Sequence, residues 1–181
     1  MMPGSDQAPE FERSALEAYR RGDMAAAYDD FLAARAAYDS SGRPLKAAEM
    51  ANNLCVVLVQ LGRGREAVWV VQGTAETFTE GGDLLSAARA SGNLASALEA
   101  AGDLEAAATA YQQALEGLRA LGDPAGESQT WQALSRLQLR RGAPLAAATS
   151  AQAALDTNPS PGPVRGFLRR ILGWVFRLPR P

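Results

Sequence analysis

The chain has 181 residues, of which 47% are hydrophobic and 21% are charged. This length predicts a single domain or one short repeat array, and the apolar content argues against general disorder. Histidine is absent and Cys55 is the only cysteine, so the usual general base near neutral pH, an intramolecular disulfide and a thiolate metal cluster are excluded.

The two ends of the chain differ in charge. The net charge is −2, and five arginines with no acid follow Asp156, so the rest of the chain carries −7. An acidic body is a poor match for nucleic acid, and we expect no nucleic-acid partner; only the C-terminal segment is basic enough to seek an anionic surface.

The N-terminal segment does not look like a secretory signal. Residues 1–8 lack an apolar stretch, and we expect them to be disordered. No run of about 18 apolar residues occurs anywhere, so a membrane-spanning helix is not expected. Together with the single cysteine, these features predict a cytoplasmic protein.

Glycine recurs along the chain at a fixed spacing of 40 residues. One series is Gly22, Gly62, Gly102 and Gly142, and a second series is Gly42, Gly82, Gly122 and Gly162. The two series alternate every 20 residues, which predicts stacked pairs of helices. Glycine can end one helix, and the aspartate that follows it in Gly22-Asp23 or Gly102-Asp103 can cap the next. We expect helices over residues 9–21, 23–41, 44–61, 64–80, 83–101, 103–121, 124–141 and 144–157.

The third pair of helices carries a recognisable motif. It reads Asn93-Leu94-Ala95, Gly102-Asp103, Ala107, Tyr111 and Ala114-Leu115. This motif resembles the tetratricopeptide repeat, and weaker copies recur in the same register in the other three pairs. The spacing is similar to that of the longer-repeat group that includes kinesin light chains. The resemblance covers residues 9–159 and implies an all-α, right-handed solenoid of four helix-turn-helix units.

Small residues recur where the two helices of each unit should touch. These positions are Ala15, Cys55, Ala95 and Ser135 on the first helices and Ala27, Ala67, Ala107 and Ala147 on the second helices. Only small side chains allow two helices to approach within about 8–9 Å. Cys55 is therefore predicted to be a packing residue and not a reactive thiol.

The sequence contains no phosphate-binding, dinucleotide-binding or zinc-binding motif, and its serines and threonines have no histidine to activate them. We therefore expect no catalytic residues, cofactor or metal, and an enzyme is a remote alternative.

The resemblance implies that the first helices line a concave groove that binds a peptide or protein partner. The candidate groove residues are Asn52, Asn53, Val56, Gln60, Arg89, Asn93, Ser96, Gln132, Arg136 and Arg140. Asn53 and Asn93 occupy one repeat position, where an amide can both donate to and accept from a ligand's backbone. The alternative is that these amides bond a neighbouring helix. The arginines could attract an acidic peptide or be solvated surface groups.

The second helix of the second unit contains Trp69 beside three valines. Apolar residues at consecutive positions surround a helix, so Trp69 is either part of a convex docking patch or buried under the extra turn of the long repeat.

After a linker at 160–163, residues 164–178 are predicted to form a basic amphipathic helix, followed by a tail at 179–181. Its principal residues are Arg165, Phe167, Leu168, Arg169, Arg170, Ile171, Trp174 and Val175. Three roles fit this pattern: a cap on the end of the solenoid, an interfacial membrane helix, or a helix for a partner or a second copy.

The sequence thus predicts a non-catalytic adaptor or assembly factor that binds a peptide or protein. The alternative is a peripheral membrane scaffold, anchored through the C-terminal helix and self-assembling through its repeats.

Overall fold

Helices follow one another along the chain in pairs. The structure is a computed structural model that describes residues 7–157, and these residues form nine α-helices and no strand. The predicted linker, amphipathic helix and tail at 160–181 lie outside the described residues, as do residues 1–6.

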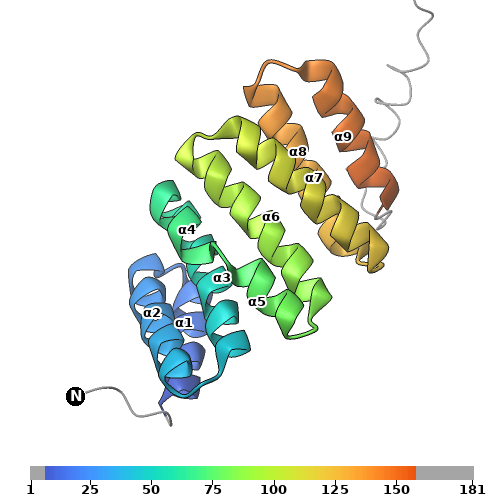
Figure 1. Ribbon diagram of the computed structural model, residues 1–181. Coiled ribbons are helices and arrows are strands. Elements are labelled where there is room, and N and C mark those ends of the chain that lie inside the picture. Colours follow the sequence, from blue (N-terminus) through green and yellow to red (C-terminus); the bar gives the residue numbers. More distant parts are fainter. Residues whose placement is uncertain (1–6, 158–181) are drawn as a thin grey trace, which may run out of the picture.

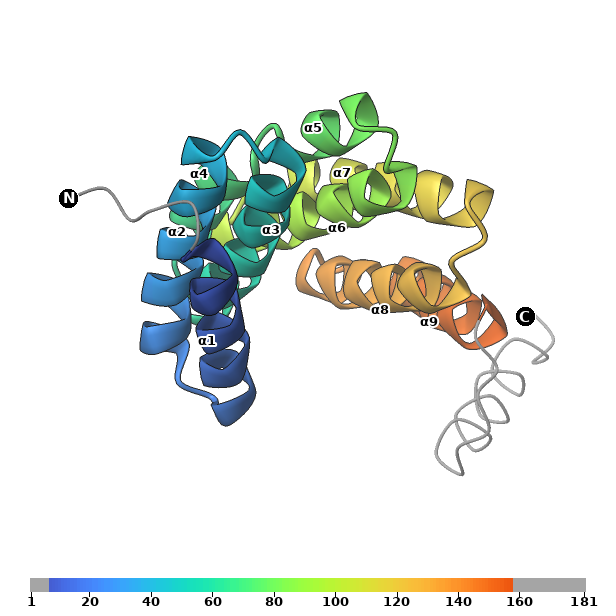
Figure 2. The ribbon, with the colours of Figure 1, turned by 90° about the horizontal axis from the view of Figure 1, so that it is seen from below.

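The helices group into four units in the predicted order (Figure 1). Their bounds are α1 Ala8–Arg21, α2 Met24–Ser40, α3 Pro44–Gln60, α4 Gly64–Val71, α5 Thr74–Glu80, α6 Leu84–Ala101, α7 Leu104–Ala120, α8 Pro124–Arg140 and α9 Pro144–Thr157. The first helices of the units are α1, α3, α6 and α8. Each second helix packs against the first helix of the next unit, so the units form a solenoid. Figure 2 shows that the solenoid follows an arc, with α1 near one end and α9 at the other.

The helix boundaries follow the glycine and aspartate positions. Gly22 ends α1 in the left-handed conformation with a φ of 80°, which a side chain would disfavour. The next residue, Asp23, accepts a hydrogen bond from the backbone N–H of Ala26 at 3.1 Å and so caps α2. Asp83, Asp103 and Asp123 cap α6, α7 and α8 in the same way.

Small buried residues bring the paired helices together. Ala15, Ala95 and Cys55 are almost fully buried, and so is Ala107 on the second helix of the third unit. Burial raises the pKa of the Cys55 thiol to about 12, and its Sγ lies 3.6 Å from the carbonyl oxygen of Asn93. The thiol is therefore protonated at neutral pH and packs between units, as the repeat pattern predicts.

The predicted helix at 64–80 is wrong, because it is broken into α4 and α5. Gln72 leaves the helical conformation with a ψ of 130°, and Gly73 adopts a φ of 84°. The hydroxyl of Thr74 donates to the carbonyl of Val71 at 2.8 Å and satisfies a group that the break exposes. Trp69 on α4 is 74% exposed, so the alternative of its burial is also wrong.

The second and third units touch through their backbones. A Cβ atom added at Gly64, the first residue of α4, would lie 2.3 Å from the carbonyl carbon of Ala100 in α6. This contact has no room for a side chain, so glycine at position 64 sets the distance between α4 and α6.

Replacing Gly64 by alanine should therefore destabilise the fold by about 1–3 kcal/mol, because α4 must move away from α6. Gly92→Ala is the matched control. Its Cβ would meet Ala114 at an ordinary 3.8 Å, and alanine should stabilise the interior of α6 by roughly 0.5–1 kcal/mol. Urea unfolding of both variants measures the difference; equal stabilities would contradict the close approach.

Candidate groove between α6 and α8

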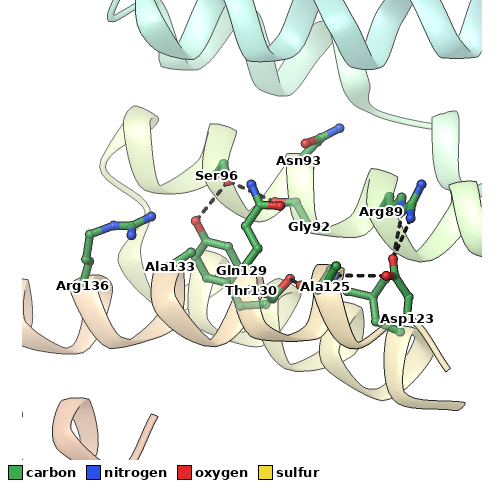
Figure 3. A pocket seen from close by; sticks show the side chains of 13 residues that line it. Arg89, Gly92, Asn93, Ser96, Asp123, Ala125, Gln129, Thr130, Ala133 and Arg136 are labelled. Atoms are coloured by element: carbon green, nitrogen blue, oxygen red, sulfur yellow. Dashed lines mark hydrogen bonds and ion pairs between the residues drawn. The ribbon is translucent and has the colours of Figure 1, made fainter. Parts of the chain in front are cut away.

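An open cleft lies between the first helices of the third and fourth units. Its volume is about 380 Å³, which is within the range of ligand sites. Figure 3 shows polar side chains from both helices around this cleft. Its lining comprises Arg89, Gly92, Asn93 and Ser96 of α6, Tyr111 and Leu118 of α7, the cap Asp123, and Ala125, Gly126, Gln129, Thr130, Ala133 and Arg136 of α8.

Two ion pairs join α6 to the α8 segment near the two ends of the cleft. At one end the guanidinium of Arg89 donates to Asp123 at 2.8 and 3.1 Å. At the other end Arg140 of α8 donates to Glu99 of α6 at 2.8 Å. The two helices are thereby held beside each other while the space between them stays open.

These pairs change how two predicted groove residues must be regarded. Arg89 and Arg140 each share their charge with a carboxylate of the chain, so neither is a free cation for a partner. Arg136 is exposed and makes no ion pair within residues 7–157. A single unpaired arginine, instead of three, therefore gives the groove its positive charge.

Asn93 contributes an uncommitted amide to the cleft. No hydrogen bond to its side chain forms within the described residues, and the amide is half-buried at the cleft wall. Ser96, by contrast, donates to the carbonyl of Gly92 and lies 3.1 Å from the hydroxyl of Tyr111. Tyr111 in turn donates to Glu99, and its pKa is raised to about 12, mainly by burial.

Gln129 is a cleft residue that the sequence reasoning missed. It is exposed at the centre of the cleft, and its amide has no partner among residues 7–157. Its repeat position is that of Arg89, 40 residues earlier, which was named as a groove residue. The repeat position that Gln129 shares with Arg89 would have identified it from the sequence.

The other predicted groove residues lie outside this cleft. On α3, Asn53 has no side-chain partner within the described chain, whereas the amide oxygen of Asn52 lies 3.3 Å from the hydroxyl of Thr74. Gln60 donates to the hydroxyl of Tyr19 at 2.8 Å, and Val56 is half-buried. Gln132 on α8 is exposed and lies 3.5 Å from Ser128. Asn53 and Asn93 thus share both a repeat position and an available amide.

The chemistry that this surface offers is hydrogen bonding and one positive charge. Across residues 7–157, no group of three or more acids or cysteines is placed to hold a metal ion. No helix in the same region combines the length and the apolarity needed to span a bilayer.

The Arg89–Asp123 pair predicts a pH dependence of stability. The hydrogen bonds from Arg89 and from the N–H of Gly126 hold the pKa of Asp123 below its ordinary value of 3.8. The unfolded chain therefore binds more protons as the pH falls through that range, and the pair's contribution, present at neutral pH, is lost below about pH 4. Asp123→Asn keeps the cap but loses the charge.

We expect Asp123→Asn to unfold with a shallower loss of stability between about pH 5 and pH 3 than the wild type, because other carboxylates such as Asp83 still titrate. Asp123→Ala removes the cap as well and should cost about 0.5–2 kcal/mol at pH 7. Urea titrations over this pH range measure both effects, and an Asn variant with an unchanged slope would exclude a stabilising pair.

Residues 46–120 match the sequence pattern of the tetratricopeptide repeat. The chain is similar in fold to the crystal structure of BtubC (BKLC) from P. vanneervenii, with 22% identity, a TM-score of 0.69, and coverage of 96% of this chain and 67% of that one. MamA from Desulfovibrio magneticus RS-1 aligns over 88% of this chain and 98% of its own, with 19% identity and a TM-score of 0.35. No curated protein matches the sequence. Residues 46–120 therefore carry tetratricopeptide repeats, within a helical solenoid that runs through residues 7–157.

Proposed function

We propose that this chain is a non-catalytic adaptor that binds an extended segment of a partner protein in the cleft between α6 and α8. Tetratricopeptide repeats are protein-interaction modules, and that coarser role follows from the family. The observation that carries the finer proposal is the set of uncommitted polar side chains in one open cleft: Asn93, Gln129 and Arg136.

An extended peptide offers hydrogen-bonding partners for these side chains. Each peptide group has one donor and one acceptor, and a carboxamide such as Asn93 or Gln129 can pair with both. Asn53 continues the same chemistry on α3, one repeat earlier. A partner strand that crosses the first helices would therefore meet an amide on two successive units.

Arg136 adds a preference for charge. Its guanidinium is exposed at the cleft and its charge is unshared within residues 7–157. Because a carboxylate accepts two parallel hydrogen bonds from a guanidinium, an acidic side chain in the peptide would be favoured there. Arg89 contributes less to this preference for acidic peptides, because its guanidinium is already paired with Asp123.

The alternative function, a peripheral membrane scaffold, depends on residues 164–178, which lie outside the described residues. Among residues 7–157, the uncommitted side chains of the cleft are two amides and a guanidinium, which supports a binding role over the enzyme alternative.

The proposal predicts that Asn53→Ala with Asn93→Ala weakens peptide binding about ten-fold, since each lost hydrogen bond is worth roughly 0.5–1.5 kcal/mol. The probe is a set of peptides selected on the full chain from a randomised library, with affinity measured by fluorescence polarisation. Helicity and thermal stability should be unchanged, because neither amide has a partner in the described chain.

Asn52→Ala is the control, since Asn52 lies against Thr74 and is expected to leave affinity intact. Arg136→Gln should weaken acidic peptides more than neutral ones. If the double variant keeps its affinity but loses stability, the asparagines are structural and the groove assignment is wrong.

A further inference from the structure

Three residues of the cleft are smaller than the residues at the same repeat positions in the junction between the first and second units. They are Gly92 of α6, Leu118 of α7 and Gly126 of α8. Two repeats earlier in the chain, these positions hold Glu12, Tyr38 and Lys46. The cleft therefore opens where the first junction carries three long side chains.

At the first junction these long side chains meet one another. The hydroxyl of Tyr38 donates to the carboxylate of Glu12, and the ammonium group of Lys46 donates to the same carboxylate at 3.1 Å. The Nζ atom of Lys46 also lies 6.0 Å from the centre of the Tyr38 ring. Tyr38 is almost fully buried. An aromatic ring and a paired acid and base thus fill the space between these helices.

The junction between the second and third units is also filled by a ring. There the repeat position of Leu118 holds Phe78, which is 4% exposed. Phe78 packs with Ala48 of α3 and Ala87 of α6. At both earlier junctions the second helix therefore buries a ring of its own at this position, whereas the junction with the cleft has the shorter leucine.

The cleft has the size and the lining that a ring requires. Its volume is about 380 Å³, and an apolar cavity of roughly 150 Å³ is enough to bind benzene. Ala125 and Ala133 add apolar surface to that of Leu118, while the amides of Asn93 and Gln129 also border the cleft. Burial of an aromatic side chain removes a large apolar area from water, so a ring is well suited to this space.

We propose that the cleft holds an aromatic socket, formed by Gly92, Leu118 and Gly126, for a phenylalanine or tyrosine side chain of the partner segment. This inference rests on the proposed function and adds the side chain that the partner must carry. The partner's ring takes the place that Tyr38 and Phe78 fill from within the chain at the earlier junctions. The partner thereby completes the packing of the third and fourth units.

A charged side chain is a poorer occupant of the aromatic socket. At the first junction the charge of Glu12 is balanced by Lys46, but both of these positions are glycine in the socket. A charge inserted there has no counter-ion at either position, and burial of an unpaired charge is unfavourable. Arg136 lies ten residues beyond Gly126 on α8, which is about 15 Å along the helix, so its preference for an acid acts at another point of the partner.

A double-mutant cycle with a peptide selected on the full chain tests the socket. We expect phenylalanine or tyrosine at one position of the selected peptides, and replacing this ring by alanine should weaken binding to the wild type about ten-fold. Gly92→Asn introduces the side chain that the second unit has at Asn52. In this variant the same peptide change should cost less than about two-fold, because the ring has lost its place.

The Gly92→Asn variant should fold normally. A Cβ atom at position 92 would meet Ala114 and Thr130 at 3.8 and 4.0 Å, which are ordinary contacts. Ala36→Asn, on the exposed face of α2, is the matched control. It should leave the affinity for both peptides unchanged.

The outcomes separate the socket from the proposed function. If the ring contributes equally to binding in the wild type and in Gly92→Asn, it binds elsewhere and the socket is overturned. Selected peptides that lack an aromatic residue overturn it too. When such peptides still depend on Asn53 and Asn93, only the socket fails, whereas the absence of any peptide binding overturns both proposals.

A larger side chain from within the chain tests the space without a partner. Leu118→Phe restores the ring of the second unit, which should enter the cleft, leave the melting temperature unchanged and weaken binding of aromatic peptides. Leu137→Phe is the control, because Leu137 is fully buried and does not border the cleft. It should lower the melting temperature by about 4 °C or more through overpacking. Equal losses in the two variants would mean that the cleft has no room for a ring, against the proposal.

The competing occupant of the socket is Trp69 of a second copy, because this side chain is 74% exposed. Sedimentation of the full chain without peptide distinguishes the two. A monomer supports a socket that is open to a partner. An oligomer that both Trp69→Ala and Gly92→Asn dissociate assigns the socket to a second copy and overturns the proposal.

Discussion

Close contact between paired helices is the constraint on which the rest of the molecule depends. Alanine, cysteine or serine at the crossing position lets the two helices of a unit touch, and such a small residue recurs every 40 positions. A side chain one methylene larger would force the helices apart. The small size of the residues at these positions therefore sets the distance between the helices. The left-handed glycines and aspartate caps then turn the chain into the next helix at a constant interval.

The repeat length is constant, but the contacts at each junction between successive units differ. At the second junction Gly64 lies on the backbone of Ala100, and Cys55 reaches the carbonyl of Asn93. At the third junction ion pairs hold α8 to α6, and a cleft remains between them. The contact between the second and third units is therefore close, whereas the one between the third and fourth units leaves an open cleft. The groove proposed to bind a partner exists because ion pairs hold α6 and α8 together near its two ends while the space between them stays open.

Charged side chains and apolar side chains occupy the two sides of the fourth unit. Between the third and fourth units, charges position helices whose facing side chains stay free for a ligand. At the outer end of the fourth unit, the repeat positions of Glu99 and Glu105 hold the exposed leucines Leu139 and Leu145. On the proposed function, the space between the third and fourth units is kept open for a partner.

The sequence by itself determined the all-α repeat, the four units and most helix limits, because helix caps, glycine turns and small contact residues are local signals repeated in register. It also predicted the packing role of Cys55. It missed the break at Gly73, since one glycine within an otherwise helical segment is ambiguous until the neighbouring helix is known. It placed Asn93 and Arg136 at the groove, but it could not show that Arg89 and Arg140 are paired with Asp123 and Glu99. Those pairs join residues 34 and 41 positions apart, and only the stacking of two units brings them within hydrogen-bonding distance. The tertiary structure alone decided which polar side chains remain available to a partner.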